Sequence, residues 1–320
     1  MAAVCRQCCT PVHRDPAQRP AGRDFDQPRP PQHLASVSGA AQRTDWEGML
    51  MDPRTDWDFS GRSVVVTGGT KGIGFVVATA FLEAGADVMV CGRHTPATLP
   101  HHSGRTASFR ATDVRDPSDA AGLIDDTVAA HGGLDVLVNN AGGSPDADAA
   151  TVSPRFVEKI LALNLLAPFY AAQAANSVMQ ANPEGGSIIN IGSVSAHDPQ
   201  PGTAAYSAAK AGLLVLTKAL ALEWAPAVRI NHITTGLIRT ESAASVYGDD
   251  GGAAVINTLP MGRMAVPDDI ANACLFLASR SASYVNGADL AVHGGGEYPA
   301  RYVATHSGVS QRSVAREGVR

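Results

Sequence analysis

The sequence lacks an excess of basic residues and any apolar run long enough to cross a membrane. Its 320 residues carry a formal net charge of -5 without a basic stripe, which argues against nucleic acid as a ligand because phosphate binding depends on clustered Lys and Arg. The longest apolar runs, such as 211–222, are interrupted by Lys218 and fall short of the roughly 20 residues of a membrane helix. We therefore expect no nucleic-acid and no membrane partner, and a small neutral or anionic molecule as the ligand.

The sequence also lacks a disulfide framework. Its five cysteines are an odd number without repeated spacing, which is typical of a protein of the reducing cytoplasm, and we expect a cytoplasmic location. Cys5 and Cys8 form a CxxC, but no second CxxC or HxxxH lies nearby to complete four zinc ligands. No metal site is predicted.

Composition divides the chain into three parts. Residues 1–58 are rich in Pro, Arg, Gln and Ala without a period of 2 or 3.6, and we expect a disordered extension. This stretch has neither the apolar core of a secretory signal nor the acid-poor composition of a transit peptide, and translation from Met49 or Met51 is an alternative. Residues 59–300 are predicted to form a single domain, and the polar residues 301–320 a flexible tail.

Within 59–300, short β-branched runs alternate with Ala-rich and Leu-rich segments, which is the pattern of βαβ units. The expected strands are Ser63–Thr67, Asp87–Cys91, Thr106–Arg110, Asp135–Asn139, Ser187–Gly192, Arg229–Ile233 and Ala288–Val292. The expected helices are Ile73–Ala84, Pro117–Ala130, Pro154–Gln180, Tyr206–Trp224 and Pro267–Ala278. Mostly apolar strands are covered on both faces, so the pattern predicts an α/β fold with one doubly wound parallel sheet of about seven strands.

A glycine-rich turn follows the first expected strand and leads directly into a helix. Gly68 lets the chain turn off the strand, Gly72 lets the backbone approach a pyrophosphate, and Gly74 lets the helix pack close to the sheet. The helix N-terminus supplies free N–H donors for phosphate. The strand before and the helix after favour dinucleotide binding over an ordinary turn.

The spacing of these glycines is GxxxGxG, with Thr70, Lys71 and Ile73 between them, and it resembles the TGxxxGIG motif of the short-chain dehydrogenase/reductase family. The family's other motifs follow in order, namely NNAG at Asn139-Asn140-Ala141-Gly142, then Asn164, Ser193, and YxxxK at Tyr206 and Lys210. The set is similar to that of 3-oxoacyl-thioester (acyl-carrier-protein) reductases. The resemblance implies a Rossmann-type fold, hydride transfer with a nicotinamide cofactor, and cofactor contacts from the turn and from Asn140, Ala141 and Gly142.

The tip of the second strand bears on the choice of cofactor. An NAD enzyme places an acid there to bind the ribose 2′-hydroxyl, whereas this chain reads Val90-Cys91-Gly92-Arg93-His94. By the family pattern, Arg93 and Lys71 are placed to pair with a 2′-phosphate, so we expect NADP, with NAD as the less favoured alternative. Asp113 and Val114 resemble the family's adenine contact, and an N-cap for the next helix is the alternative role of Asp113.

Tyr206 and Lys210 lie four residues apart and therefore share one face of the expected helix. A phenol with an ordinary pKa of about 10 is a poor base at neutral pH, but an adjacent ammonium and the cationic nicotinamide stabilise the phenolate. Tyr206 is thus predicted to act as general acid and base. By the resemblance, Lys210 also binds the nicotinamide ribose. A surface helix pair is the ordinary alternative for an isolated YxxxK.

Two further residues complete the predicted catalytic set. Ser193 follows an apolar strand, 13 residues before Tyr206 as in the family, and its hydroxyl can polarise the substrate oxygen. Asn164 is the single polar side chain in an apolar helical stretch, where an unpaired amide costs ~1–3 kcal/mol, so it needs partners. The resemblance implies that it kinks the helix and holds a proton-relay water, and a structural role is the competing interpretation.

The chain departs from the family after the sixth expected strand, where Thr235 replaces the proline before Gly236. Proline restricts φ, so threonine either loosens this loop or adds a hydroxyl to the pocket. Gly236, Ile238 and Thr240 are nevertheless expected to contact the cofactor, with Thr240 at the carboxamide by resemblance. His293 also stands where the family more often has an acid.

The sequence therefore predicts an NADP-dependent oxidoreductase that interconverts a carbonyl and a secondary alcohol. The alternatives are an NAD-dependent alcohol, hydroxysteroid, sugar or polyol dehydrogenase, and a non-catalytic dinucleotide-binding protein. The expected helices Pro154–Gln180 and Tyr206–Trp224 carry apolar residues around more than one stripe, Leu213 and Leu222 among them. Because such surplus apolar surface is usually buried by symmetric association, we expect a homotetramer or homodimer.

Overall fold

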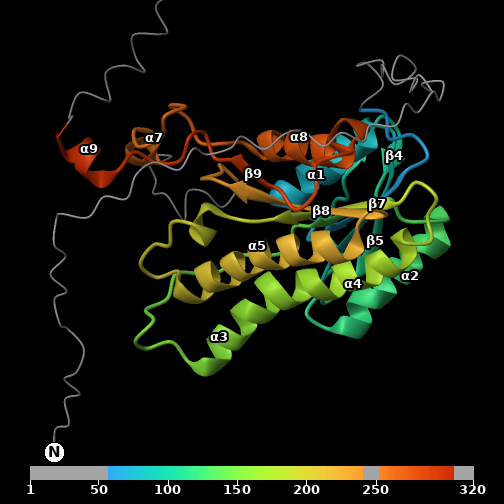
Figure 1. Ribbon diagram of the computed structural model, residues 1–320, viewed down its shortest axis with the longest axis horizontal. Helices are drawn as coiled ribbons and strands as arrows, with labels where there is room; N and C mark the ends of the chain where they lie inside the picture. The colour runs from blue at the N-terminus through green and yellow to red at the C-terminus, as the bar shows by residue number, and fades with distance from the viewer. Residues whose placement is uncertain (1–56, 241–251, 306–320) are drawn as a thin grey trace, which may run out of the picture. The chain divides into compact units, whose positions relative to one another are not determined.

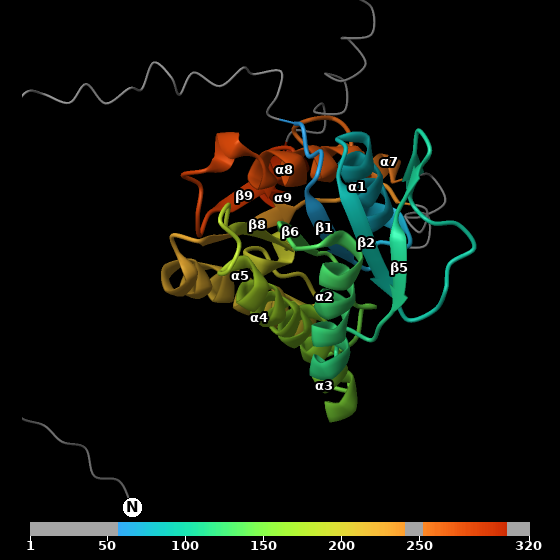
Figure 2. The same ribbon diagram turned by 90° about the vertical axis from the view of Figure 1, so that its right-hand side faces the viewer.

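A computed structural model describes residues 57–240 and 252–305, which all belong to the compact unit 51–320. Its centre is a parallel sheet in the order β5-β2-β1-β6-β7-β8-β9, shown in Figures 1 and 2. The strands are β1 (Ser63–Thr67), β2 (Asp87–Gly92), β5 (Ser108–Ala111), β6 (Val136–Asn139), β7 (Gly186–Ile191), β8 (Val228–Thr235) and β9 (Asp289–Val292). The prediction of a seven-stranded, doubly wound parallel sheet is confirmed.

Helices cover both faces of this sheet (Figure 2). One face carries α1 (Gly72–Glu83) and α8 (Pro267–Ala278), and the other carries α2 (Pro117–His131), α4 (Ala167–Met179) and α5 (Ala204–Trp224). The short elements are β3 (His101–His102), β4 (Arg105–Thr106), α3 (Pro154–Leu161), η2 (Ala162–Leu166), η3 (Val194–Ala196), α7 (Ala253–Ile256), η4 (Arg280–Ala282) and α9 (Ala300–Thr305).

The core forms because the central strands are apolar on both sides. Val64, Val65 and Val66 of β1 are fully buried, and alternate residues pack into the two separate layers of side chains above and below the sheet. Phe59 is also buried and stacks edge-to-face on Phe81 of α1, with ring centroids 5.1 Å apart. The apolar core therefore includes the start of the predicted 59–300 domain.

Three segments differ from the sequence-based prediction. The third strand of the sheet begins at Ser108, because Arg105 and Thr106 pair instead with His101 and His102 in a small antiparallel ribbon. The single helix predicted over Pro154–Gln180 is divided into α3, the π-helix η2 and α4. The chain is helical over Ala300–Thr305, where a flexible tail was expected from residue 301. The remainder of that tail and the extension 1–56 lie outside the described residues.

Helix α5 is apolar in composition, and one face of it is buried in the domain. It is the one helix in the described ranges that is long and apolar enough, by length and composition, to cross a membrane. However, it packs against β8 and α4, and Leu213, Leu220 and Lys210 are buried there. It is therefore a core helix of the α/β domain, and its buried face positions residues of the candidate site.

Strands β1 and β6 are neighbours, and the chain winds outward from them in opposite directions. Ligands of open α/β sheets bind beyond the carboxyl ends of the strands at such a switch point. The predicted site residues follow the ends of β1, β2, β5, β6, β7 and β8 or lie on the adjoining helices α1, η2 and α5. The topology thus brings segments far apart in sequence to one edge of the sheet.

Candidate active site

The glycine-rich turn leaves the N-terminus of α1 open for an anion. Gly68 and Gly72 have φ of 65° and 54°, a conformation that favours glycine, and a Cβ on Gly72 would meet no atom within 4 Å. Lys71 is the N-cap of α1 and makes no side-chain capping bond, so the first N–H groups of the helix keep their capacity for a phosphate. Ile73 packs partly buried on the core behind the turn.

Gly74 has a different role from Gly72. A Cβ there would lie 2.4 Å from the side-chain nitrogen of Asn140, so only glycine fits. That nitrogen donates to the carbonyl oxygens of Thr67 and Gly68, at 2.9 and 3.2 Å. The hydroxyl of Thr67 in turn accepts from the backbone N–H groups of Asn140 and Ala141, both at 3.0 Å. The TGxxxGIG and NNAG segments therefore form one hydrogen-bonded unit.

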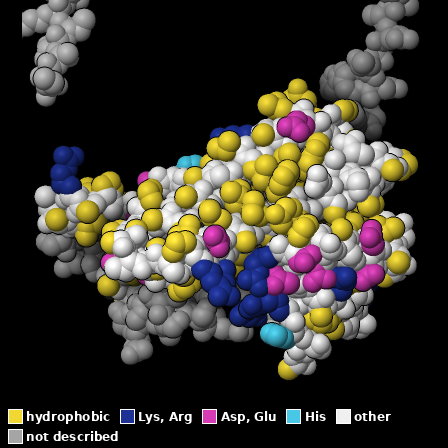
Figure 3. All heavy atoms as spheres, turned by 90° about the horizontal axis from the view of Figure 1, so that it is seen from below, with side chains coloured by type: hydrophobic (Ala, Val, Ile, Leu, Met, Phe, Trp, Pro, Cys, Tyr) yellow, Lys and Arg dark blue, Asp and Glu magenta, His cyan; other side chains and the backbone are white. Residues whose placement is uncertain are grey.

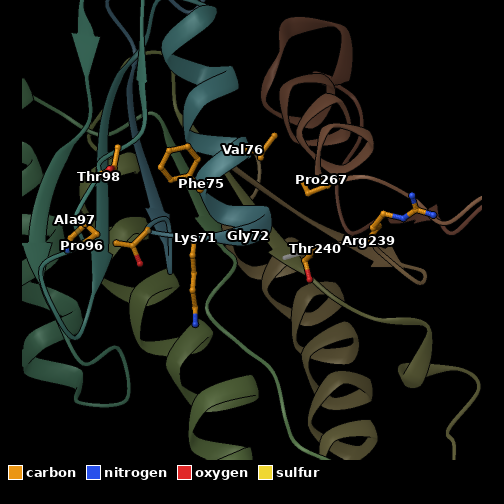
Figure 4. A pocket seen from close by; sticks show the side chains of 11 residues that line it. Lys71, Gly72, Phe75, Val76, Pro96, Ala97, Thr98, Arg239, Thr240 and Pro267 are labelled. Carbon is orange, nitrogen blue, oxygen red and sulfur yellow. The ribbon is translucent and has the colours of Figure 1, made fainter. Parts of the chain in front are cut away.

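A pocket of about 550 Å³ opens beside this unit, within the size range of small-molecule sites (Figure 4). Its lining residues are Thr70, Lys71, Gly72, Phe75, Val76, Pro96, Ala97, Thr98, Arg239, Thr240 and Pro267. Figure 4 shows the Lys71 side chain extending from the turn, with Pro96 and Ala97 on one side of it and Thr240 and Arg239 on the other. Four predicted cofactor contacts, Thr70, Lys71, Gly72 and Thr240, thus line one cavity.

Arg93 and Asp113 follow β2 and β5, which are neighbours in the sheet. Arg93 is exposed, and its charge contributes to the lowering of the pKa of Asp113, although the larger cause is the hydrogen bond from Arg115. The Arg115 guanidinium binds both carboxylate oxygens of Asp113. The alternative role of Asp113 as the N-cap of α2 is wrong, because Asp116 caps that helix. Val114 is buried in the core below.

The buried Lys210 and the partly buried Tyr206 meet on one face of α5. The ammonium nitrogen of Lys210 lies over the Tyr206 ring, 5.7 Å from its centroid, and donates a 2.7 Å hydrogen bond to the carbonyl oxygen of Ile191. Burial lowers the pKa of Lys210 to about 8. A lysine held in this way stays charged at neutral pH beside the phenol, which is the arrangement that an acid–base tyrosine requires.

Asn164 lies in the π-helix η2 and is completely buried. Its Nδ2 donates to the carbonyl oxygens of Gly143 and Ile160, both at 3.0 Å, and its Oδ1 accepts from the N–H of Gly143 at 2.9 Å. These bonds satisfy the amide, as the apolar surroundings require. Asn164 thereby ties the chain beyond β6 to the irregular helix. A π-turn of this kind is frequent at functional sites.

Gly142, the last residue of NNAG, lies between two predicted catalytic residues. A Cβ there would stand 2.9 Å from Oδ1 of Asn164 and 3.3 Å from Nζ of Lys210. The backbone at Gly142 is therefore in close contact with both side chains. The motif therefore connects the glycine-rich turn, through Asn140, with the predicted catalytic residues Asn164 and Lys210.

Ser193 follows β7 and is nine-tenths buried, with 9% of its surface exposed. Its Oγ accepts a 3.2 Å hydrogen bond from the N–H of Ser195, so its own hydrogen is available to a substrate oxygen. Ser195 therefore serves as a turn residue. The helix η3 that begins after Ser193 packs against α5, which carries Tyr206.

Thr235 gives the loop after β8 a contact that proline cannot make. Its hydroxyl is buried and donates a 2.9 Å hydrogen bond to the carbonyl oxygen of Gly192, the residue before Ser193. The following Gly236 packs against His293, whose Cα would be 2.8 Å from a Cβ at Gly236. Ile238 is buried and forms a β-bridge with Ala265, which holds the loop before Thr240. The threonine therefore ties the loop to β7 rather than loosening it.

Some residues of the site were not found from the sequence. Arg115 and Arg239 lie outside the family motifs as isolated basic residues, and His232 reads as one more residue of an apolar strand. Only the register of β7 and β8 brings His232 against Gly192, the residue before Ser193. Among residues 57–240 and 252–305, no group of three His, Cys, Asp or Glu could hold a metal ion. The CxxC at Cys5 lies outside these ranges.

Comparisons with known proteins agree with this geometry. Residues 68–297 match the family described as Enoyl-(Acyl carrier protein) reductase. The chain is 35% identical to a 3-oxoacyl-(acyl-carrier-protein) reductase of Chlamydia trachomatis serovar D over 241 residues, which cover 73% of this chain and 96% of that protein.

Solved structures give the same result. A short-chain type dehydrogenase/reductase from Mycobacterium marinum superposes with a TM-score of 0.71 and 34% identity, covering 76% of this chain and 98% of that one. A 7 alpha-hydroxysteroid dehydrogenase complexed with NADH and 7-oxo glycochenodeoxycholic acid superposes with a TM-score of 0.72 and 29% identity, covering 78% and 99%. The fold, the ordered motifs and these matches show that the chain belongs to the short-chain dehydrogenase/reductase family.

Proposed function

We propose that this protein is an NADP-dependent oxidoreductase that interconverts a ketone and a secondary alcohol. The observation that carries the proposal is the pairing of the buried Lys210 with the partly buried Tyr206 on α5, with Ser193 just after the strand β7. A protein that only bound a dinucleotide would have no need to bury a lysine against a tyrosine at this edge of the sheet.

The chemistry divides between the cofactor and the chain. When bound, the nicotinamide supplies or accepts the hydride at the carbonyl carbon. In the reduction, the Tyr206 hydroxyl gives its proton to the carbonyl oxygen, while the Ser193 hydroxyl donates a hydrogen bond to the same oxygen. The Lys210 ammonium stabilises the phenolate that remains on Tyr206. In the oxidation, the phenolate takes the proton from the alcohol.

The residues around the turn fit a dinucleotide. The uncapped N-terminus of α1 and the open face of Gly72 suit a pyrophosphate. The choice of NADP rests on two cations. Arg93 follows β2, at the place where an NAD enzyme has an acid, and Lys71 belongs to the glycine-rich turn and lines the pocket. NAD is the second candidate, and the structural relative that was solved with NADH favours it.

The experiment is a matrix of two cofactors and several substrates. NADPH and NADH oxidation should be measured with an acetoacetyl thioester, a 7-oxo bile acid, a sugar lactone and an aliphatic ketone, because the relatives act on acyl thioesters and on a 7-oxo steroid. We expect turnover of at least one carbonyl with NADPH preferred over NADH. Tight binding of NADPH without turnover of any carbonyl, or of the matching alcohols with NADP, would contradict the enzymatic function.

We further propose that the protein is a homotetramer or homodimer built around the face that α4 and α5 cover. Figure 3 views the molecule from this side and shows apolar side chains gathered along it. Leu213 and Leu220 are buried within the subunit, whereas Leu222 is 85% and Val215 is 66% exposed, and Leu166 of η2 is also exposed. Large exposed apolar residues on one face favour burial against another copy of the chain.

A further inference from the structure

A row of buried polar side chains crosses the sheet beneath the catalytic residues. Asn139, Asn190, His232 and Asp289 are direct partners on the adjacent strands β6, β7, β8 and β9. Asn139 donates to Oδ1 of Asn190 at 2.9 Å, and Asn190 donates to Thr217 of α5 at 2.9 Å. The row therefore lies on the face of the sheet that α5 covers. Asn139 and Asn190 are hydrogen-bonded to each other, whereas His232 and Asp289 form a separate pair of ionisable side chains.

Asp289 is held from three sides. It accepts from His232 Nδ1 at 2.8 Å, from the hydroxyl of Thr234 at 2.6 Å, and from His197 Nε2 at 2.8 Å. Burial raises the pKa of Asp289, but the hydrogen bonds from Thr234 and His232 outweigh it, so the pKa is lowered overall. Asp289 is therefore an ionised carboxylate, and an ionised carboxylate only accepts. His232 must carry its hydrogen on Nδ1.

The second ring nitrogen of His232, Nε2, makes no hydrogen bond within the described residues. The side chain is completely buried. A buried polar atom without a partner is costly and calls for a functional explanation. Nε2 lies against Gly192, where a Cβ would be only 2.0 Å away. The imidazole thus occupies the place of a side chain at the residue just before Ser193.

Gly192 is also fixed by its backbone. Its N–H donates to the carbonyl oxygen of Ile233 at 2.8 Å, and its carbonyl oxygen accepts from Thr235 at 2.9 Å. With the ring of His232 against its α-carbon, three residues of β8 hold Gly192. Because Ser193 is the next residue in the chain, the contacts that hold Gly192 also restrict the position of the Ser193 hydroxyl.

Lys210 approaches the same corner from α5, through its bond to Ile191 of β7. The ionisable groups that face His232 are Asp289 on β9, Lys210 on α5 and His197 beyond η3. Burial lowers the pKa of His232, the bond to Asp289 opposes this, and the charges of Lys210 and His197 lower it further. The net result is a neutral ring whose electron-rich nitrogen lies on the face of the sheet from which Lys210 reaches β7.

We propose, on the basis of the oxidoreductase function proposed above, that His232 is a positioning residue of the active site. Asp289 holds its imidazole neutral and turned against Gly192, and in this state the ring fixes Ser193 and stabilises the charged form of Lys210. His197 lies outside this pair and only completes the hydrogen bonding of the carboxylate.

The principal variant is Asp289→Leu, which removes the acceptor that holds the hydrogen of His232 on Nδ1. The imidazole is then free to carry its hydrogen on Nε2, which turns an N–H toward Gly192 on the face of the sheet that α5 covers. Loss of the correct tautomer by such a change can lower kcat by several orders of magnitude in enzymes where the histidine itself transfers protons. Here the effect is indirect, and we expect a fall of roughly tenfold in kcat, an unchanged KM for NADPH, and an alkaline limb of the pH profile that moves to lower pH by about one unit.

The matched control is His197→Gln, which removes the other, half-exposed histidine from the same carboxylate. It should leave the pH profile at that of the wild type. A merely structural role of Asp289 would lower the melting temperature in both variants and leave both pH profiles unchanged, and this outcome would overturn the proposal.

A second measurement on the unaltered protein needs no substrate. In cofactor-free protein labelled with ¹⁵N-histidine, NMR should show one histidine that stays neutral with hydrogen on Nδ1 across the neutral range, and His232→Gln should remove that signal. A charged His232, or one with hydrogen on Nε2, would overturn the inference even if the enzyme reduces carbonyls. If no carbonyl is reduced but this signal is present, the oxidoreductase function fails while the state of His232 stands.

Discussion

The ammonium nitrogen of Lys210 lies 5.7 Å from the centroid of the Tyr206 ring, on the buried side of one helix. This relationship places a buried cation next to the phenol ring of Tyr206. Desolvation of the lysine has a free-energy cost, which appears as the lowering of the pKa of Lys210 to about 8. A buried cation with a lowered pKa at a sheet edge is a candidate for a catalytic group, which is the role proposed above for Lys210.

Tyr206→Phe should abolish turnover and leave NADPH binding in place. The change removes the proton donor and keeps the ring that packs beside Lys210, and loss of a general acid typically costs ~10²–10⁴-fold in rate. Turnover and NADPH binding, followed by fluorescence titration, provide the two readouts. Tyr284→Phe is the control, because Tyr284 is fully exposed and lies outside the family motifs in the sequence. A Tyr206→Phe enzyme with more than roughly a tenth of the wild-type kcat would exclude the assignment.

Lys210→Met should raise thermal stability at neutral pH while it removes activity. At neutral pH the lysine is charged in the folded and in the unfolded chain, so folding bears the cost of burying the charge. Between pH about 8 and the ordinary value of 10.5 the unfolded chain binds more protons, and stability from this group therefore rises with pH through that window. The difference in pKa corresponds to roughly 3 kcal/mol at most, reduced by the lost bond to Ile191.

Melting curves of wild type and Lys210→Met across this pH window check the expectation. The melting temperatures of the two proteins should differ most at neutral pH and should converge as the pH approaches 10.5. A variant that is less stable than the wild type at every pH would show that the packing and the hydrogen bond of Lys210 outweigh the cost of its charge.

Arg93→Asp should shift the cofactor preference from NADP toward NAD. An acid at this place repels a 2′-phosphate and can accept from a 2′-hydroxyl, and we expect the ratio of the two KM values to move by roughly tenfold or more. Arg280→Asp makes the same charge change at the exposed η4, away from the glycine-rich turn. If both variants keep the wild-type ratio, Arg93 is only a solvated surface charge.

Val215→Glu combined with Leu222→Glu should dissociate the assembly into smaller species. Both side chains are exposed on α5, and burying two carboxylates in an apolar contact is unfavourable. Light scattering at micromolar concentration gives the mass of each protein. Tyr284→Glu places a charge on an exposed side chain outside α4 and α5 and should leave the mass unchanged. A wild-type protein that is monomeric and active would refute the predicted oligomer.

Local patterns in the sequence predict most of the fold. The alternation of β-branched and helical segments predicts all seven strands of the sheet, because short apolar runs between turn residues have few other stable conformations. The third strand is placed two residues early, since Arg105 and Thr106 suit a strand equally well in the small ribbon with His101 and His102. The apolar pattern alone predicts an unbroken helix through Asn164, and only the family resemblance implies a kink there, where the structure has the π-helix η2.

The contact between Tyr206 and Lys210 of the predicted catalytic set also follows from the sequence, since the two residues interact through the regular spacing of one helix. The contacts of the residues around them cannot be predicted from the sequence. His232 and Asp289 are 57 residues apart, and Thr235 and Gly192 are 43 apart. Their contacts depend on which strands are neighbours and on the register between them, and a shift of one residue would turn each side chain to the other face of the sheet. The sequence by itself determined the βαβ pattern and the order of the family motifs, whereas only the tertiary structure decided which buried groups contact Gly192 before Ser193 and the ammonium of Lys210, because strand pairing across the sheet has no local signal.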